Sequence, residues 1–362
     1  MVDTEQKLAG YLPVLAAASW VALDTEADSL HAYPEKVCLI QISTVSGDRL
    51  IDPLAGINLD PLLDALADHE LIMHGADYDL RLLRKHHAFV PRAIFDTMLA
   101  ARLLGCRQFG LSYLVEQRLG IRLEKGQQKA NWALRPLTPR MERYARNDTH
   151  YLKPLADQLK DQLVAAGRLA WHQEACTRLI ADAAKERPTD RDSVWRLKGS
   201  HLLGRPALAI LRELWQWREN EALAANRPPF FVLSHQTLVD VAAAAAAARP
   251  YERLLPRHLS ERRRRALRQA VTRGLLLPPE QRPGPVHCSG RRPHRDERGR
   301  FLLLQQRRDA AAAKLGLDPT VIASRATLSA LAHDWPQYQA DLMPWQRELL
   351  AGDGPGPRMS GG

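Results

Sequence analysis

The sequence predicts an α/β domain built on a mixed β-sheet, followed by two small helical domains. Short apolar strands alternate with amphipathic helical patterns over about the first 165 residues, which is typical of a sheet with helices packed against it. From Arg205 to Leu275 only helical periodicity remains. A length of 362 residues exceeds the usual size of one domain, so two or three domains are expected.

Four short strands are predicted in the first part of the chain. The first three follow one another with gaps too short for a crossover helix, so we expect them to form an antiparallel meander. Later strands alternate with helices, which makes the sheet mixed. The strands are Trp20–Asp24, Val37–Ser43, Arg49–Asp52 and Glu70–His74.

Helical patterns lie between and after these strands and return near the end of the chain. In the first part they cover Leu59–Ala67, Tyr78–His87, Thr97–Leu104, Gly110–Leu119 and Pro139–Leu163. In the last part they cover Phe301–Leu317, Thr320–His333 and Gln337–Leu350.

Composition divides the chain into six segments. Residues 1–170 form the α/β domain, 171–200 a charged helical linker and 201–280 the first helical domain, where Leu208, Leu211 and Leu214 share one helix face. Residues 281–300 are rich in Pro, Gly and Arg, as in a flexible linker. A second helical domain follows at 301–352, and the Gly/Pro-rich tail 353–362 is expected to be disordered.

Bulk composition excludes several classes of protein. With 45% hydrophobic and 25% charged residues, and no period in its glycines, the chain is globular and neither collagen-like nor wholly disordered. No apolar run approaches the roughly 20 residues that span a bilayer, and the N-terminus lacks the layout of a secretory signal, so we expect a cytoplasmic protein without a membrane segment. Four scattered cysteines, at 38, 106, 176 and 288, indicate small buried side chains rather than zinc ligands or disulfides.

Charge is distributed unevenly along the chain. Residues 1–170 hold 20 Lys+Arg against 21 Asp+Glu, and the remainder holds 31 against 20, so the excess positive charge lies in the C-terminal half. A basic half of this kind favours binding to a polyanion such as nucleic acid. Arginine richness from a GC-rich genome is the alternative.

Two groups of residues have the chemistry of a metal site. Asp24 and Glu26 stand at the end of the first predicted strand at positions i and i+2, and therefore point to one side, where a pair of carboxylates suits Mg²⁺ or Mn²⁺. Tyr144 and Asp148 share a helix face at i and i+4, so a phenol lies beside a carboxylate. Taken singly, each pair is also explained by a polar strand end or a half-buried tyrosine.

The turn from His74 into the next helix carries further acidic residues, Asp77 and Asp79. Acidic residues in a first helical turn are often only partners of the helix dipole. Together with the two groups above, however, one of them completes a set of four carboxylates and one tyrosine. That set matches the requirements of two divalent ions that hydrolyse a phosphodiester.

The ordered motifs resemble those of a known family. Asp24-x-Glu26, then Asp79 in a His-Gly-Ala-x-x-Asp-Leu context, then Tyr144-x-x-x-Asp148 resemble the three motifs of DEDD-type 3′-to-5′ exonucleases in the tyrosine-bearing branch. The stretches 95–97, 123–132 and 135–137 are similar to the ribonuclease D subgroup. The stretches 215–222 and 227–229 resemble the helicase-and-RNase-D C-terminal (HRDC) domain, and 315–347 resembles its second, degenerate copy.

The resemblance implies an RNase H-like exonuclease domain that carries two divalent metal ions. It implies that the metal ligands are Asp24, Glu26, Asp79 and Asp148, and that Tyr144 orients the attacking water. The spacing from His74 favours Asp79 over Asp77 as the ligand. Contact with the terminal nucleotide is expected from Thr25 and His74, whereas Gln128 is either a substrate contact or a surface residue. Asp96 and Trp132 are expected to support the fold or the substrate groove.

The resulting hypothesis is a 3′-to-5′ exoribonuclease that trims tRNA precursors and other structured RNAs and releases nucleoside 5′-monophosphates. A DNA exonuclease and a non-catalytic RNA-binding scaffold are the two alternatives. Contacts to RNA phosphates are expected from a basic helical stretch that contains Arg262, Arg263, Arg264 and Arg265, although a solvated charged face has the same composition. The expected partner is RNA, without an obligate protein partner, for a chain that acts as a monomer.

Overall fold

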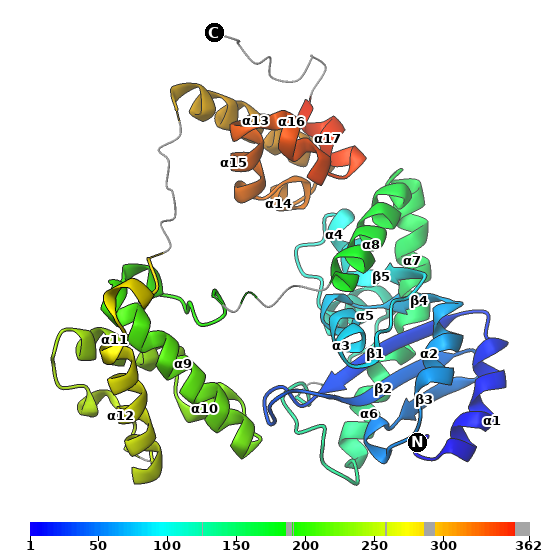
Figure 1. Ribbon diagram of the computed structural model, residues 1–362. Helices are drawn as coiled ribbons and strands as arrows, with labels where there is room; N and C mark the ends of the chain where they lie inside the picture. The colour runs from blue at the N-terminus through cyan, green and yellow to red at the C-terminus, as the bar shows by residue number, and fades with distance from the viewer. Residues whose placement is uncertain (125, 186–189, 191, 258, 286–293, 352–362) are drawn as a thin grey trace. The chain divides into compact units, whose positions relative to one another are not determined.

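A computed structural model describes residues 1–124, 126–185, 190, 192–257, 259–285 and 294–351 (Figure 1). The chain forms two compact units, of which the first contains residues up to 27, from 37 to 185 and from 294 onward. The second unit contains residues 28–36 and the described residues between 190 and 285. The predicted tail, Cys288 and parts of both predicted linkers lie outside the described residues.

The first unit is built on a five-stranded mixed sheet with the strand order β3-β2-β1-β4-β5. β1 and β3 pair antiparallel with β2, whereas β4 is parallel to both β1 and β5, so the predicted meander and mixed sheet are confirmed. The strands are β1 (Val21–Ala27), β2 (Val37–Thr44), β3 (Gly47–Ile51), β4 (Glu70–Met73) and β5 (Ala93–Asp96).

Two elements of this unit were not predicted. β5 has only four residues and no alternating pattern, so its strand structure depends on pairing with β4. The helix α1 (Glu5–Ala16) is interrupted by Pro13, which weakens its helical signal, yet Thr4 caps its first turn by accepting a hydrogen bond from the Lys7 backbone.

The predicted helix from Pro139 to Leu163 is in fact two helices, α6 (Pro139–His150) and α7 (Leu152–Ala165). Pro154 explains the break, because a proline ring clashes with the carbonyl four residues earlier, here that of His150. The break ends α6 at the edge of the sheet. The remaining helices of this part are α2 (Asp60–Ala67), α3 (Asp77–His87), α4 (Thr97–Leu103), α5 (Leu111–Leu119) and α8 (Leu169–Ala184).

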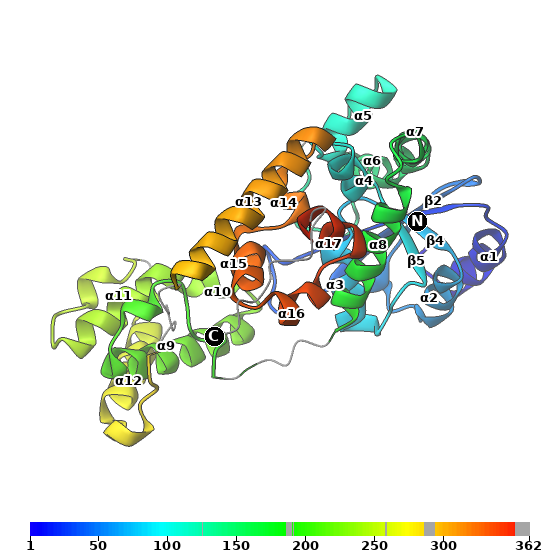
Figure 2. The ribbon, with the colours of Figure 1, turned by 90° about the horizontal axis from the view of Figure 1, so that it is seen from above.

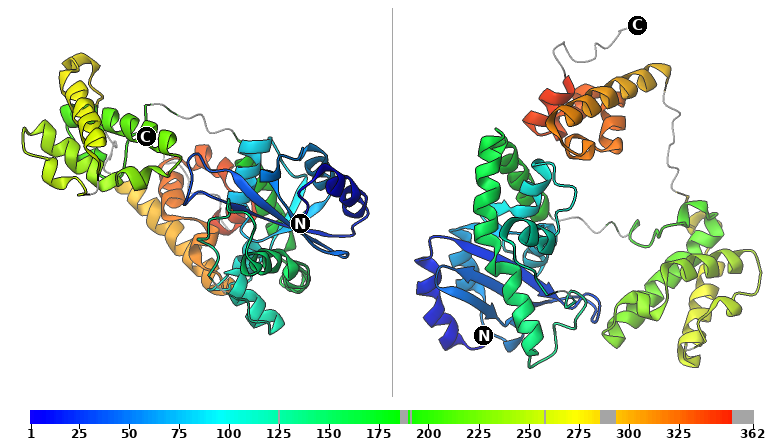
Figure 3. Two further views of the ribbon diagram at one scale, coloured as in Figure 1. Left: turned by 90° about the horizontal axis from the view of Figure 1, so that it is seen from below. Right: turned by 180° about the vertical axis from the view of Figure 1, so that it is seen from behind.

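Helices cover both faces of the sheet (Figure 2). Leu23 of β1 packs with buried residues of α1, α2 and α3. Its neighbour Ala22 points to the other face and packs with α4, α5 and α7. Seen from behind, α6 and α7 cross that second face (Figure 3). The site described below is formed where α6 meets the strands.

The C-terminal helices belong to the same unit. Trp345 stacks on Trp171 of α8 with ring centroids 4.7 Å apart, and Arg168 donates to the carbonyl of Leu315 at 2.6 Å. The helix α13 begins at Arg295, so residues 295–300 are helical and not part of a loose linker as predicted. The elements are α13 (Arg295–Leu315), α14 (Pro319–Ile322), α15 (Arg325–His333), α16 (Trp335–Tyr338) and α17 (Pro344–Ala351).

The second unit is helical, as predicted for this region. Its longest helices, α9 and α12, enclose an apolar core that includes Leu208, Leu211 and Leu214. The buried guanidinium of Arg218 is paired with Glu219 at 2.9 Å, and Glu219 also accepts the hydroxyl of Tyr33 at 2.5 Å. The helices are α9 (Arg205–Ala225), α10 (Pro229–Val232), α11 (His235–Ala246) and α12 (Glu261–Leu276).

Two further sequence predictions concern cysteines and membranes. Cys38 and Cys176 are buried and Cys106 is half-buried, and all three are free thiols, in agreement with the prediction. Across the described part of the chain, no helix has the length and apolar character needed to span a membrane.

The packing of α12 on α9 depends on Gly274. A Cβ atom at this position would lie 2.5 Å from Ile210 Cα and 2.8 Å from Ile210 N. We predict that Gly274→Ala pushes α12 away from α9. The free energy needed to open these two helices to amide exchange should fall by about 1–3 kcal/mol. Amide hydrogen exchange of peptides from α9 and α12 measures this change. Gly10→Ala is the control, because open space surrounds Gly10 and the α1 helix tolerates alanine.

Candidate active site

The first two carboxylates of the site come from the middle of β1. The strand continues to Ala27, so Asp24 and Glu26 lie within it and not at its end as predicted. In the register with β2, Asp24 is opposite Gln41 and Glu26 is opposite Leu39. Because alternate residues of a strand share a face, both carboxylates point to the side that α6 covers.

The third carboxylate, Asp148, comes from α6. Carboxylate oxygens of Asp24, Glu26 and Asp148 all lie within 4.8 Å of one another. The helix is held on the sheet by apolar and polar contacts, because Met141 packs against Leu39 and the Thr149 hydroxyl is 2.7 Å from that of Ser43. The predicted meeting of these three residues is therefore found in the structure.

The fourth carboxylate, Asp79, approaches from the first turn of α3. It is buried and accepts a hydrogen bond from the Thr25 hydroxyl at 2.5 Å. Asp77 is exposed instead and pairs with Arg81 at 2.7 Å. The structure thus brings Asp79 into the cluster and leaves Asp77 on the surface.

Asp96 holds the turn that positions Asp79. Its buried carboxylate accepts four backbone N–H groups, two from the turn before α3 and two from the first turn of α4. The donors are Gly75 at 3.1 Å, Ala76 at 2.8 Å, Met98 at 2.8 Å and Leu99 at 3.1 Å. Asp96 is therefore a support of the fold, which was one of its two predicted roles.

His74 lies in the same turn, next to Thr97. Its Nδ1 atom is 2.9 Å from the Thr97 hydroxyl, which itself donates to the carbonyl of Met73 at 3.1 Å. Because the hydroxyl hydrogen of Thr97 is used in that second bond, its oxygen accepts a hydrogen bond from His74. The ring proton of His74 therefore lies on Nδ1. Burial lowers the pKa of His74, so the ring is neutral near pH 7.

Tyr144 faces the acidic cluster from α6, one helical turn before Asp148. Burial and the nearby charges of Asp148, Glu26 and Asp24 raise the pKa of Tyr144, and the Gln128 side chain lies close enough to oppose this rise. The ring of Trp132 lies 6.0 Å from the Tyr144 ring, centroid to centroid. Gln128 and Trp132 therefore both approach the tyrosine, which favours a supporting role for Trp132 as predicted.

Burial and mutual repulsion raise the pKa values of all four carboxyl groups. The pKa rises to about 9 for Glu26 through burial and the charges of Asp148 and Asp79. It rises to about 7 for Asp148 and to about 6 for Asp79, in both cases mainly through burial. The pKa of Asp24 is raised by burial and by the three other carboxylates. Such a cluster is suited to divalent cations, which relieve the repulsion and prefer oxygen ligands.

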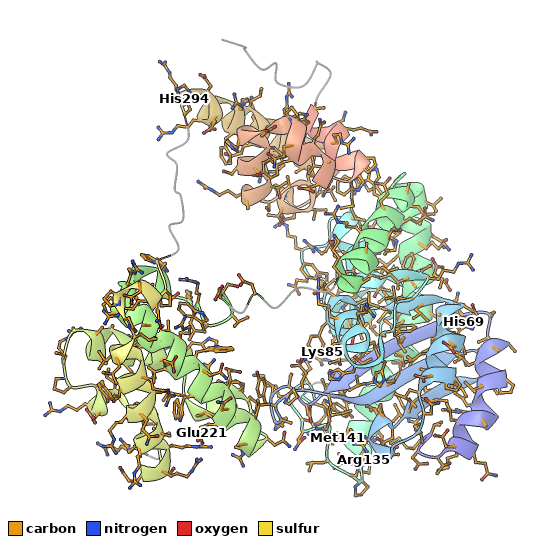
Figure 4. All side chains as sticks on the ribbon, in the orientation of Figure 1. His69, Lys85, Arg135, Met141, Glu221 and His294 are labelled. Atoms are coloured by element: carbon orange, nitrogen blue, oxygen red, sulfur yellow. The ribbon has the colours of Figure 1, made fainter. Side chains whose placement is uncertain are left out.

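The four arginines predicted to contact phosphates differ in their surroundings. Arg263 and Arg264 are half-buried, the first paired with Glu221 at 3.0 Å and the second donating to the carbonyls of Leu259 and Pro256. Arg262 is exposed and also pairs with Glu221, which Figure 4 labels, and Arg265 is exposed. Two of the four thus have a structural role inside the second unit.

Asp52 and Arg135 were given no role from the sequence, yet they form an ion pair at 2.6 Å beside the site. The signal available for Arg135 was its place in the Arg-Pro-Leu triplet of the ribonuclease D-like stretch. Asp52 had no local signal, because it has the pattern of a polar strand end.

Comparisons with known proteins agree with this geometry. A family model described as 3′-5′ exonuclease matches residues 1–164, and one described as HRDC domain matches residues 207–247. Ribonuclease D of Zymomonas mobilis subsp. mobilis is 35% identical over 251 residues, which is 67% of this chain and 63% of that protein. Ribonuclease D of Granulibacter bethesdensis is 28% identical over 363 residues, 98% of this chain and 91% of that protein.

Structural comparison extends the likeness to nearly the whole chain. The crystal structure of Escherichia coli RNase D has a TM-score of 0.75 and 24% identity, and the match covers 98% of this chain and 99% of that one. The fold and the matched domains define a 3′-5′ exonuclease fold with a helical C-terminal part that includes an HRDC domain. The chain is similar to proteins named ribonuclease D, and its first 164 residues match the 3′-5′ exonuclease family model.

The raised pKa values lead to a prediction about stability without metal. A carboxyl group whose pKa is raised by folding stabilises the protein at low pH, and this contribution is lost as pH rises through the folded-state value. With folded-state values of about 6, 7 and 9 for Asp79, Asp148 and Glu26, stability in EDTA should fall between pH 5 and 9, by at least about 3 kcal/mol. Urea unfolding at a series of pH values measures the effect.

Mg²⁺ or Mn²⁺ should cancel most of this loss, because a bound cation favours the ionised carboxylates. Glu26→Gln is the matched variant and should reduce the pH dependence in EDTA. Stability that rises from pH 5 to 9 without metal would contradict the electrostatic description.

Proposed function

We propose that this protein is a metal-dependent 3′-to-5′ exoribonuclease. The observation that carries the proposal is the cluster of Asp24, Glu26 and Asp148, with oxygens within 4.8 Å of one another and with the Tyr144 side chain close enough for their charges to raise its pKa. The match with curated relatives such as the Zymomonas protein spans 63% of their length, so activity and substrates are inferred here from the site itself.

The four carboxylates would hold two divalent cations, Mg²⁺ or Mn²⁺. Bound cations of this kind supply Lewis-acid chemistry, which activates water and stabilises charge on a leaving oxygen. The Tyr144 hydroxyl, which lies close to Asp148 and Gln128, then orients the attacking water. The described site needs no covalent nucleophile, and the product would be a nucleoside 5′-monophosphate.

RNA is the substrate class we favour over DNA. The relatives named ribonuclease D are ribonucleases by name. The exosome complex exonuclease RRP6 of Saccharomyces cerevisiae, which is 30% identical over 259 residues, is an exonuclease by name. The helical C-terminal part, which holds the excess positive charge, provides a surface for structured RNA. We infer that precursors of tRNA and other structured small RNAs with 3′ extensions are trimmed.

Paired variants of Asp79 and Asp77 test the catalytic assignment. We predict that Asp79→Asn lowers the rate of RNA shortening at least 100-fold, because it removes a ligand charge, whereas Asp77→Asn stays within about 2-fold of the wild type. The measurement is a time course on 5′-labelled RNA and DNA oligonucleotides of matched sequence with Mg²⁺, Mn²⁺ or EDTA.

A ladder that shortens from the 3′ end of RNA, depends on metal and vanishes in Asp79→Asn and Asp24→Asn would support the proposal. Faster shortening of DNA would identify a DNA exonuclease. No shortening of either substrate by the wild type would leave the RNA-binding scaffold as the remaining hypothesis.

Two of the exposed arginines of α12, Arg262 and Arg265, are predicted to bind phosphates. The double variant Arg262→Ala/Arg265→Ala should weaken RNA binding and reduce the slope of log affinity against log salt by roughly 1 to 2, because each phosphate contact releases counterions. Arg264→Ala is the control, since its half-buried guanidinium serves backbone carbonyls and its loss should not change that slope. An unchanged slope in the double variant would exclude Arg262 and Arg265 as phosphate contacts.

A further inference from the structure

The side chain of Arg135 is saturated with hydrogen bonds. Its five N–H groups make five contacts, all short. Nε donates to one carboxylate oxygen of Asp52 and Nη2 donates to the other, at 2.6 Å each. Nη2 also donates to the carbonyl of Cys38 at 2.8 Å. Nη1 donates to the carbonyls of Trp132 and Leu134, also at 2.8 Å each.

These contacts join three separate segments. Cys38 is on β2, Asp52 follows β3 directly, and Trp132 and Leu134 lie in the segment that precedes α6. Asp52 is itself buried and fixed, because its Oδ1 atom also accepts the Leu54 backbone N–H at 3.0 Å. Arg135 therefore attaches the segment before α6 to β2 and to the residue that follows β3.

The attached segment contacts the tyrosine of the site. The indole of Trp132 is 1% exposed and packs in a core cluster with Leu39 of β2 and Met141 and Ala145 of α6. Its ring is 6.0 Å from the Tyr144 ring, and Gln128, four residues earlier in the same segment, lies close enough to the Tyr144 hydroxyl to oppose the rise of its pKa. Both residues that approach Tyr144 thus belong to the segment whose backbone Arg135 holds at Trp132 and Leu134.

We propose that Arg135 and Asp52 are positioning residues that fix the orientation of the Tyr144 hydroxyl through the segment 128–134. Neither residue is among the carboxylates of the cluster, so they act on Tyr144 and not on metal binding. The bidentate geometry requires arginine: a lysine at 135 keeps the charge but has three donors on one atom and cannot reach both Asp52 oxygens and three carbonyls. The consequence for turnover rests on the proposed exonuclease function.

The test is a double-mutant cycle between Arg135→Lys and Tyr144→Phe. We expect Arg135→Lys alone to lower kcat for RNA about 10-fold or more while KM changes less than about 2-fold, since a misplaced hydroxyl affects water and not RNA binding. In the Tyr144→Phe background, Arg135→Lys should lower kcat by less than about 2-fold, because the group that Arg135 positions is already absent. Equal effects in both backgrounds would overturn the proposal.

A second measurement does not depend on activity. Hydrogen exchange of peptides covering residues 126–137 should accelerate at least about 10-fold in Arg135→Lys, while Mn²⁺ affinity measured by calorimetry stays within about 2-fold of the wild type. Arg143→Lys is the matched control on α6, because Arg143 is exposed and its nearest ion-pair distance, to Glu124, is 3.8 Å. It should leave exchange, Mn²⁺ affinity and kcat unchanged.

The kinetic cycle and the hydrogen-exchange measurement distinguish a failure of the proposed exonuclease function from a failure of the proposed positioning role. An inactive wild type would refute the exonuclease function, and the exchange result would still decide whether Arg135 holds the segment. Unchanged exchange in Arg135→Lys would overturn the positioning role whatever the activity. If Arg135→Lys does not fold, Asp52→Asn serves as the second variant, because it keeps the size of the side chain and weakens the same bidentate pair.

Discussion

The mutual repulsion of four carboxylates is the constraint on which the first unit depends. Asp24, Glu26, Asp79 and Asp148 come from β1, α3 and α6, and burial raises the pKa of each. Charges at such separations inside a protein disfavour one another by several kcal/mol unless a cation or protons neutralise them. The fold therefore has to hold these elements together against a force that drives them apart.

Three sets of hydrogen bonds hold the elements around the four carboxylates in place. Asp96 collects four backbone N–H groups and fixes the turn that presents Asp79. The contact between Ser43 and Thr149 attaches the end of α6 to β2. Arg135 attaches the segment before α6 to the start of β2 through the Cys38 carbonyl and to the end of β3 through Asp52. None of these three sets uses a carboxylate of the acidic cluster. The residues that hold the elements in place therefore differ from the residues that would react.

In the second unit the charges that need partners are positive, because they are those of its arginines. Glu221 pairs with Arg262 and Arg263, and the buried Arg218 pairs with Glu219. A count of arginines in the sequence therefore overstates the positive charge free for a polyanion. Arg262 and Arg265 are exposed, and the proposed RNA contact is made by these two residues, of which Arg262 would have to share its charge between Glu221 and a phosphate.

The sequence by itself determined the mixed sheet, the antiparallel meander and the identity of the acidic residues, because alternation along β1 and the turn of α6 are local properties that the residue pattern records. Only the tertiary structure decided what depends on contacts between distant segments. It placed Asp79 in the cluster and Asp77 on the surface, formed β5 by pairing with β4, and divided the arginines of α12 into structural and exposed ones. The pairing of Asp52 with Arg135 joins residues 83 positions apart, and no local pattern encodes a contact of that kind.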